Sequence, residues 1–440
     1  MSGGVVVTKS SPVLVVPSDT EPATSPPDGD TVPLSSFDKC VVPFPVTTLL
    51  AYDRPINEPA ETVKRALARA LAHYRPVAGR LVTGADGEVR LSGTGEGVTF
   101  VAAAASCALD LDELARSTAL LKDLAVWYPG ELCRHDEPLV QVQVTAFACG
   151  GFVVGVTWNH VVADGAGMGQ FLRAVGELAR GVSSSAPSVR RWDDSRPGLP
   201  ASMVAEQKST MSHAGQELEY LDVTVPGSLV RRVKAESGAT AYEAAAAVLW
   251  HCRTRAAMSS SPPPPPPSSP APLSFPCNMR AHVGAADGYY GNCVTVQVVP
   301  ATKGAVAAGS VADLVRLIRR AKEKAPEILS STSSSSGVGV DGDGGGGAAE
   351  DEQPPQVGWY DALAVVSWRN LGFDAVDLGG GGPARVVWYG ERNVVPGCVV
   401  HPPCSGDGCD GGVRVSSIFV KPEHVDAFLG ELATLAAAST

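Results

Sequence analysis

The sequence predicts a mixed α/β protein with two domains of similar size, and three observations support this fold class. The chain has 440 residues, 44% of them hydrophobic, which is more than a single hydrophobic core usually holds. Segments with the apolar spacing of helices alternate with segments that have the apolar pattern of strands. A polar stretch without sustained periodicity, residues 181–216, falls near the middle. We therefore expect domains over 1–180 and 217–440, joined by this linker.

The first domain begins with an amphipathic helix and short strands. Over residues 59–73, Val63, Leu67 and Leu71 recur at every fourth position and share one face, while charged residues occupy the other. The segment from Gly79 to Leu91 is typical of strands. These elements precede the part of the domain that carries the chemistry.

A hairpin and a second helix complete the first domain. Residues 138–147 and 152–158 alternate or run apolar and are separated by a cysteine and two glycines, which predicts an antiparallel pair. After Asp164, a helical stripe follows. Its members are Met168, Phe171, Leu172, Val175 and Leu178.

The second domain repeats this alternation. Thr240 and Glu243 form a capping box that opens a helix through about Thr254. Residues 413–420 predict a strand, and Pro422 begins a final helix. No glycine fingerprint lies at a strand-to-helix turn, so a doubly wound nucleotide-binding fold is disfavoured.

Two low-complexity segments interrupt the second domain. Residues 259–272 contain a proline run that predicts an extended surface excursion, and residues 330–356 are rich in glycine, serine and acidic residues. We expect both to be insertions.

Composition excludes several classes of function. Lys and Arg number 35 and Asp and Glu 46, so the net charge is −11, and the chain lacks the basic surplus of a nucleic-acid binder. No apolar run reaches the ~18 residues of a membrane span, and we see no signal peptide. The ten cysteines are scattered, and the close pair Cys404 and Cys409 fits no metal motif. We expect a monomeric, cytoplasmic protein with reduced thiols and no metal.

His160 is the histidine best placed for chemistry. It follows the strand predicted over 152–158 and precedes a glycine-rich turn into a helix. An imidazole titrates near neutral pH, so His160 at a strand end can act as a general base, and Asp164 can orient the ring or its loop. The alternative is a core histidine followed by a helix-capping aspartate.

The segment from His160 to Gly165, followed by GxGxxQF, resembles the HxxxD signature of the plant BAHD family of acyl-CoA-dependent acyltransferases. Further elements of the family pattern occur in order along nearly the whole chain. They are Leu34–Asp38 (LSxxD), Tyr74–Leu81 (YxPxAGR), Thr240–Trp250, Asn278–Arg280, Gly288–Asn292 (YxGN) and Asp377–Pro383 (DFGWGxP).

The resemblance implies a fold and a set of residue roles. The fold would be two similar domains like those of chloramphenicol acetyltransferase, with a channel between them. His160 would be the base, Asp164 would pair with Arg280 and hold the His160 loop, and the indole N–H of Trp368 would stabilise the oxyanion. Val366 stands where the family usually has threonine. Acyl-CoA would be a co-substrate, with no permanently bound cofactor.

Two parts of the site depart from the pattern or lack a motif. In the DFGWGxP-like segment, Leu378 and Gly380 replace the aromatic residues, and we expect the four remaining members to keep the turn: Asp377, Gly379, Gly381 and Pro383. CoA carries phosphates and the chain is acidic, so the entrance to the CoA-binding site needs a local concentration of cations. Arg253 and Arg255 at the end of a predicted helix are the candidates, and a solvated helix face is the alternative.

The expected reaction is transfer of a hydroxycinnamoyl, benzoyl or acetyl group from CoA to a hydroxyl or amine of a plant metabolite. The sequence has no GxSxG element, and no cysteine lies beside His160 in the sequence. Nothing therefore indicates a covalent acyl-enzyme, and we expect direct transfer. The competing hypothesis is a non-catalytic family relative that acts as an accessory protein in a lipid or hormone pathway. A relative that uses carrier-bound substrates is less favoured, because Asn159 stands where its first histidine would be.

Overall fold

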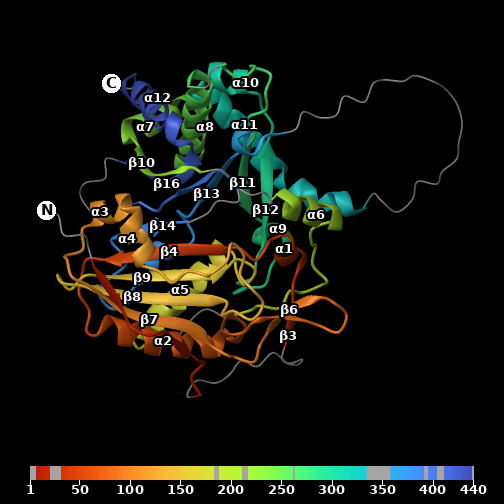
Figure 1. Cartoon of the computed structure of the whole chain (residues 1–440). Helices are drawn as coiled ribbons and strands as arrows, with labels where there is room; N and C mark the ends of the chain where they lie inside the picture. The colour runs from red at the N-terminus through yellow and green to blue at the C-terminus, as the bar shows by residue number, and fades with distance from the viewer. Residues whose placement is uncertain are drawn as a thin grey trace, which may run out of the picture.

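The computed structural model describes most of the chain. Figure 1 shows two α/β bodies, one above the other in this view, with the C-terminal helix at the far end of the upper one. The described residues are 6–19, 31–182, 188–210, 217–260, 263–333, 357–390, 395–403 and 411–438.

The lower body is built on a seven-stranded sheet. The predicted hairpin forms its centre as β8 and β9, and β7 is parallel to β8 while the other pairs are antiparallel. The strand order is β1 (Val7–Lys9), β7 (Val98–Ala105), β8 (Val140–Phe147), β9 (Phe152–Asn159), β4 (Pro45–Tyr52) and β14 (Arg385–Trp388), with β2 (Val13–Val15) also on β7.

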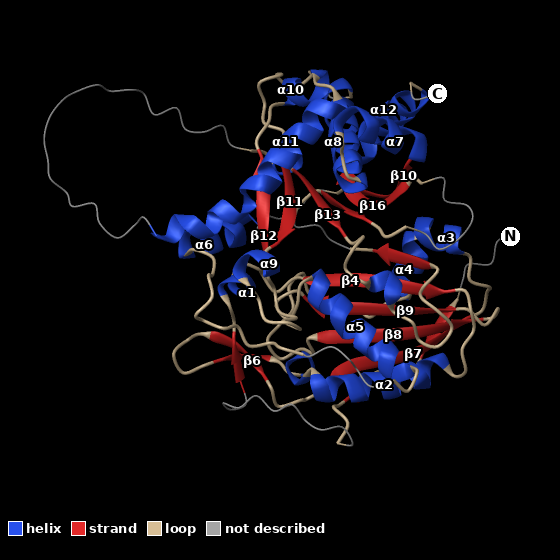
Figure 2. Cartoon of the chain, turned by 180° about the vertical axis from the view of Figure 1, so that it is seen from behind, coloured by secondary structure: helices blue, strands red, loops and turns tan. Residues whose placement is uncertain are grey.

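Helices cover both faces of this sheet. The predicted helices α2 (Pro59–His73) and α5 (Gly165–Ala179) lie side by side on one face (Figure 2), and α3 (Leu111–Arg116) and α4 (Thr118–Asp123) pack on the other. All eight residues of β9 are therefore buried. A strand covered on both faces needs apolar side chains at successive positions, which explains the continuous apolar run that precedes His160.

The upper body has a six-stranded sheet with helices on its outer face (Figure 1). Its strand order is β10 (Glu219–Val225), β16 (Val413–Val420), β15 (Gly397–Val400), β13 (Leu363–Ser367), β11 (Leu273–Asn278) and β12 (Val294–Val299). The helices are α7 (Gly227–Ser237), α8 (Ala241–Ser259), α10 (Lys303–Ala308), α11 (Val311–Lys324) and α12 (Val425–Ala437).

The central helix of the upper body, α8, begins at the predicted capping box of Thr240 and Glu243. It extends to Ser259, beyond the predicted end, and is buried on nearly all sides by the surrounding helices and the sheet. The predicted strand 413–420 is β16. Pro422 begins a 3-10 turn, and the α-helix proper starts at Val425.

Smaller elements join the two bodies. A three-stranded sheet lies at the side of the lower body, and three short helices lie beside the join (Figure 1). Short 3-10 segments occur between the larger elements. The smaller elements are β3 (Thr31–Pro33), β6 (Val89–Ser92), β5 (Leu81–Thr83), α1 (Ser36–Lys39), α6 (Ala201–Thr210), α9 (Arg280–Val283), and the turns Arg75–Ala78, Ala325–Ser333, Trp359–Asp361, Phe373–Ala375 and Pro422–His424.

The segment expected to be a plain linker contains structure of its own. Residues 188–210 include α6 and the buried side chains of Arg190 and Trp192. Trp192 packs edge to face against Phe37 and Tyr289, with ring centroids 5.4 and 5.1 Å away. Single anchoring side chains produce no periodic pattern, which is why the sequence did not reveal this packing.

One strand from the second half of the sequence belongs to the sheet of the first half, so the two bodies do not follow a simple two-part division of the chain. Arg385–Trp388, from the second half of the sequence, pairs antiparallel with Thr48–Ala51 and closes the edge of the lower sheet. The two halves are thus linked by main-chain hydrogen bonds as well as by side-chain packing.

The two predicted insertions differ in what can be described. The later part of 259–272 contacts the connection between β12 and α10: the amide of Ala271 donates to the carbonyl of Ala301, and that of Gly304 to the carbonyl of Pro267, each at 2.8 Å. This part is thus anchored at the surface. Most of the second insertion lies outside the described residues. Cys404 and Cys409 also lie outside them.

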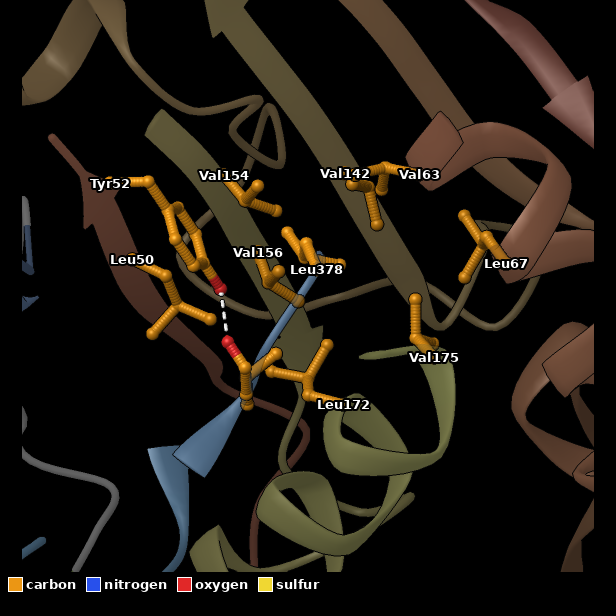
Figure 3. Close-up of a pocket in the computed structure, with 11 residues that line it drawn as sticks. Leu50, Tyr52, Val63, Leu67, Val142, Val154, Val156, Leu172, Val175 and Leu378 are labelled. Atoms are coloured by element: carbon orange, nitrogen blue, oxygen red, sulfur yellow. Dashed lines mark hydrogen bonds between the residues drawn. The ribbon is translucent and has the colours of Figure 1, made fainter. Parts of the chain in front are cut away.

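An apolar cavity lies in the lower core between the sheet and helices α2 and α5 (Figure 3). Beside it, the Tyr52 hydroxyl donates to the carbonyl of Val376 at 2.8 Å. Leu378, where the resembling motif has phenylalanine, forms part of the wall. The lining residues are Leu50, Tyr52, Val63, Leu67, Val142, Val154, Val156, Leu172, Val175, Val376 and Leu378.

This cavity predicts opposite effects for two substitutions at Leu378. Leu378→Ala enlarges a buried void and should destabilise the protein by about 2–5 kcal/mol. Leu378→Phe adds volume on the side of the void and should leave the thermal unfolding midpoint equal to or above that of wild type. Calorimetry of the two variants measures both effects. A phenylalanine variant that unfolds as early as the alanine variant would show that the cavity cannot accept the ring.

Candidate active site

His160 lies in the turn between β9 and α5 and is held through its backbone. Its amide donates to the carbonyl of Phe44 at 3.0 Å, and the Phe44 ring lies 4.9 Å from the imidazole, centroid to centroid. The side chain of Asn159 accepts from the amide of Val161 at 3.0 Å. His160 is partly exposed at the end of this buried strand, so its position is accessible, and its role as a base stays a prediction.

The environment of His160 favours the neutral ring. Burial lowers the pKa of the imidazole below its ordinary value of 6.5. The charge of Asp164, the backbone carbonyl of His160 itself, the Asn292 side chain and the charge of Asp38 oppose this effect only in part. A neutral imidazole at physiological pH can accept a proton, as a general base must.

Asp164 is turned to Arg280 and the backbone. Its two carboxylate oxygens accept from the two terminal nitrogens of the Arg280 guanidinium at 2.9 Å each, which is the predicted pair. One oxygen also caps α5 through the amide of Gly167 at 2.9 Å, and the other accepts from the amide of Cys293 at 3.0 Å. Asp164 is 2% exposed, so it ties the His160 loop to α9 and β12.

Arg280 completes this tie. Its guanidinium also donates to the carbonyls of Tyr289 and Gly291, at 3.2 and 2.7 Å. One of the two nitrogens that face Asp164 therefore also binds the loop that enters β12, and the Nε of Arg280 binds the same loop. The pair joins the two bodies directly beneath the turn that carries His160.

Trp368 follows β13 and is 4% exposed. Its backbone amide donates to the carbonyl of Val400 at 2.8 Å, and its ring packs against Phe373 with centroids 5.0 Å apart. The indole Nε1 lies 4.0 Å from the place that a Cβ on Gly165 would take. The structure thus brings Trp368 to the N-terminus of α5, the helix that follows the His160 turn.

The Asp377–Pro383 segment lies at the other end of α5. An oxygen of Asp377 accepts from the amides of Gly379 and Gly381 at 2.8 Å each, and both glycines have positive φ, +116° and +101°. Pro383 is buried. Arg180, after the last residue of α5, donates to the Asp377 carbonyl at 2.6 Å. The turn is thus formed without the two aromatic residues of the family motif.

The length of α5 separates this turn from the turn that carries His160. With 15 residues at ~1.5 Å each, α5 spans about 22 Å.

Burial raises the pKa of Asp377, but the two glycine amides and Arg180 outweigh it, so the carboxyl pKa lies below its ordinary value. A charged Asp377 fits a residue that organises a turn.

Arg253 and Arg255 lie on α8 in the upper body, and their environments differ. Arg253 is 3% exposed; its guanidinium donates to the carbonyls of Phe419 and Tyr360 and lies 4.4 Å from the centre of the Tyr360 ring. This removes Arg253 from the cofactor candidates, because its donors are used inside the core. Arg255 pairs with Glu431 at 2.6 Å on the surface and stays a prediction.

Sequence reasoning missed a buried ionic network beneath His160. Asp38 is fully buried and pairs with Arg190 at 3.0 Å, while Asn292 bonds Asp38 and the backbone of the His160 turn. Asp38 and Asn292 belong to the LSxxD and YxGN elements, so a motif marked them without giving a role. Arg190 lies in the supposed linker and carried no signal.

No thiol in this region is activated. Burial raises the pKa of Cys40 and of Cys293 to about 12, so both are protonated at neutral pH. Among the described residues, no group of three or more metal-ligating side chains occurs. In the same part of the chain, no helix combines the length and apolarity that a membrane crossing requires.

Comparison with known proteins agrees with the site. A family model described as the Transferase family matches residues 5–426. The chain belongs to this BAHD family of acyltransferases. Acyl transferase 15 of Oryza sativa subsp. japonica is 42% identical, and the alignment covers 98% of this BAHD chain and 99% of the relative.

Other BAHD relatives carry names that state an acyl group. A myricetin 3-O-glucosyl 1,2-rhamnoside 6'-O-caffeoyltransferase of Crocosmia x crocosmiiflora is 32% identical, covering 97% of this chain and 98% of the relative. A 3'-N-debenzoyl-2'-deoxytaxol N-benzoyltransferase of Taxus canadensis is 30% identical, covering 86% and 84%. The present BAHD chain is accordingly an acyltransferase.

Solved structures share the BAHD fold. Vinorine synthase has a TM-score of 0.71 at 18% identity, and each chain is covered to 98%. TRI101 of F. sporotrichioides, solved with coenzyme A and T-2, has a TM-score of 0.63 at 14% identity, covering 91% of this chain and 97% of that one. These similarities establish the fold of the two bodies.

Proposed function

We propose that this acyltransferase moves an acyl group from CoA to a hydroxyl or amine of a small plant metabolite, with His160 as general base. The observation that carries the proposal is the placement of His160. A neutral, partly exposed imidazole stands at the end of a buried strand, and its loop is fixed by the Asp164–Arg280 pair. The donor would be a hydroxycinnamoyl, benzoyl or acetyl thioester, since relatives are named for caffeoyl and benzoyl transfer.

The reaction would proceed by direct transfer. The acceptor oxygen or nitrogen attacks the thioester carbonyl carbon while its proton passes to His160. The carbon–sulfur bond then breaks, and the CoA thiolate takes the proton from His160 as the thiol leaves. Protons and electrons balance without a covalent enzyme intermediate, which agrees with the protonated state of Cys40 and Cys293. A channel between the bodies would admit CoA from one side and the acceptor from the other.

The oxyanion needs a donor that is in place before the reaction. Trp368 is the candidate, because its indole nitrogen lies beside the N-terminus of α5. The first helical amides and the helix dipole there also favour negative charge. Trp368→Phe keeps the packing against Phe373 but removes the N–H. Loss of one oxyanion donor costs about 10²–10³-fold in kcat elsewhere, which sets the scale of the expected effect.

Turnover of the purified protein tests the proposal. It would be incubated with acetyl-, benzoyl-, p-coumaroyl- and caffeoyl-CoA and with alcohol and amine acceptors, while thiol release is followed. Acceptor-dependent release of CoA is expected with at least one pair. If no acyl-CoA is consumed with any acceptor class, the enzymatic proposal fails and the accessory-protein hypothesis takes its place.

The lowered pKa of His160 predicts the pH dependence of the reaction. A base acts when neutral, so kcat/KM should fall as pH decreases, with the midpoint of the fall below pH 6.5. The fall should follow a single protonation as pH decreases. Steady-state rates between pH 4.5 and 8.5, with the enzyme shown to stay folded at each pH, give the profile. A midpoint above 6.5 would contradict the environment described for His160.

A further inference from the structure

Asn292 is the residue at which the buried network meets His160. It is 0% exposed, and its side-chain nitrogen donates to three oxygens: the Asp38 carboxylate at 2.9 Å, the His160 carbonyl at 2.9 Å and the Val161 carbonyl at 3.2 Å. Its backbone amide also donates to Asp38, at 3.1 Å. Asn292 therefore fixes the backbone of the turn that carries the base.

Asp38 fixes the orientation of the Asn292 amide. An ionised carboxylate only accepts, so it must face the amide nitrogen and not the amide oxygen. Asp38 itself cannot turn, because Arg190 pairs with it at 3.0 Å and Ser35 donates to it through its backbone at 2.9 Å and its hydroxyl at 2.8 Å. Arg190 also donates to the Val161 carbonyl at 3.2 Å. The amide oxygen of Asn292 must therefore point away from Asp38.

Oδ1 of Asn292 and Nδ1 of His160 are among the atoms of this network that are buried without a hydrogen-bond partner among the described residues. The amide oxygen can accept a hydrogen bond, and Nδ1 can donate one when it carries a proton. The Asn292 side chain is close enough to raise the pKa of His160, although the two atoms form no well-aligned bond in the free protein. Such bonds often tighten only when substrate is bound.

We propose that Asn292, held by Asp38 and Arg190, is a positioning residue that keeps the proton of the His160 ring on Nδ1 and leaves Nε2 as the base. Two groups that favour an N–H on this ring are the Asn292 side chain and the His160 carbonyl, and the Asn292 nitrogen holds that carbonyl in place. The bond made by one ring nitrogen sets the state of the other. This inference rests on the proposed function, in which His160 accepts the acceptor proton.

The role becomes most important when His160 is protonated. The proton taken from the acceptor gives an imidazolium with N–H groups on both nitrogens. The charges that face the ring are those of Asp164 and Asp38, and Asp164 is already engaged by Arg280. An amide oxygen on Nδ1–H stabilises the imidazolium without adding a charge. When Nε2 gives its proton to the CoA thiolate, the amide oxygen keeps the remaining proton on Nδ1, so the ring is again neutral with Nε2 free as the base.

Substitution of Asn292 tests the role against a merely structural one. Asn292→Ala should lower kcat about 10–100-fold, part of the ~10²–10⁴-fold value of a general base, while KM for acyl-CoA stays close to wild type. Asn292→Ser can still donate to Asp38 but has no group left for the ring, and should show the same loss in a better-folded protein. Gln207→Ala is the matched control, since this buried amide bonds Thr295 and leaves the His160 turn untouched.

A double substitution and a titration complete the test. If Asn292 acts through His160, His160→Ala combined with Asn292→Ala should be no slower than His160→Ala alone. In the protein labelled with ¹⁵N-histidine, with His160→Ala used for assignment, the pKa of His160 should fall in both Asn292 variants and stay unchanged in Gln207→Ala.

Several outcomes would overturn the inference. They are a folded Asn292 variant with wild-type kcat, a double variant much slower than His160→Ala, or a His160 titration that Asn292 does not move. An inactive wild type would instead refute the proposed function, and the titration would still decide whether Asn292 orients the ring.

Discussion

His160→Ala is expected to lower kcat/KM for acyl transfer by about 10²–10⁴-fold, the usual value of a positioned general base. The fold should survive. The imidazole is partly exposed, and the turn is held through the backbone bonds of His160 to Phe44 and Asn292, which alanine keeps. Thiol release from the best acyl-CoA and acceptor pair measures the rate, and circular dichroism verifies the fold.

The matched control is His135→Ala. His135 is an exposed histidine in a surface turn, so its removal changes composition equally but should leave the rate unchanged. A His160 variant as fast as the His135 variant would refute the assignment of the base. A slow variant with an altered unfolding midpoint would require comparison at equal folded fraction before the loss is attributed to chemistry.

Asp164→Ala should act mainly on stability, with a loss of about 3–5 kcal/mol in the free energy of unfolding. The substitution removes the cap of α5 and leaves Arg280, which is about four-fifths buried at the side chain, without its carboxylate. We expect a low soluble yield, a lower unfolding midpoint, and activity that falls with the folded fraction. Urea unfolding and the activity per folded molecule give the two quantities separately.

Removing both partners provides the control for Asp164. Asp164→Ala combined with Arg280→Ala leaves no unpaired charge, so it should be less destabilised than the sum of the single variants. The unfolding free energies of the three variants measure this coupling. A purified Asp164→Ala protein that is fully folded and fully inactive would contradict a structural role and assign Asp164 to the proton transfer.

The sequence predicted the elements whose signal is local. The helix over 59–73, the hairpin before His160 and the strand over 413–420 were found because each carries its own apolar period or turn. The pair of Asp164 and Arg280 came from the family pattern and is present.

The remainder depends on contacts between distant residues. Asp38 and Arg190 are 152 positions apart, and neither belongs to a periodic segment that would mark the pair. Arg253 was placed at the CoA site because the helix was predicted to end near Thr254, whereas α8 continues to Ser259 and Arg253 is buried. Burial of a charge is decided by tertiary structure, which a local pattern does not contain.

The pairing of Arg385–Trp388 with Thr48–Ala51 has a consequence for how the protein is made. The last strand of the lower sheet is synthesised late, so the sheet stays incomplete until most of the chain has left the ribosome. Until then β4 presents an open edge of unpaired N–H and C=O groups, the kind of edge that recruits other chains. The first 180 residues expressed alone should therefore aggregate. We therefore expect the β4 edge to need cover until translation is nearly complete.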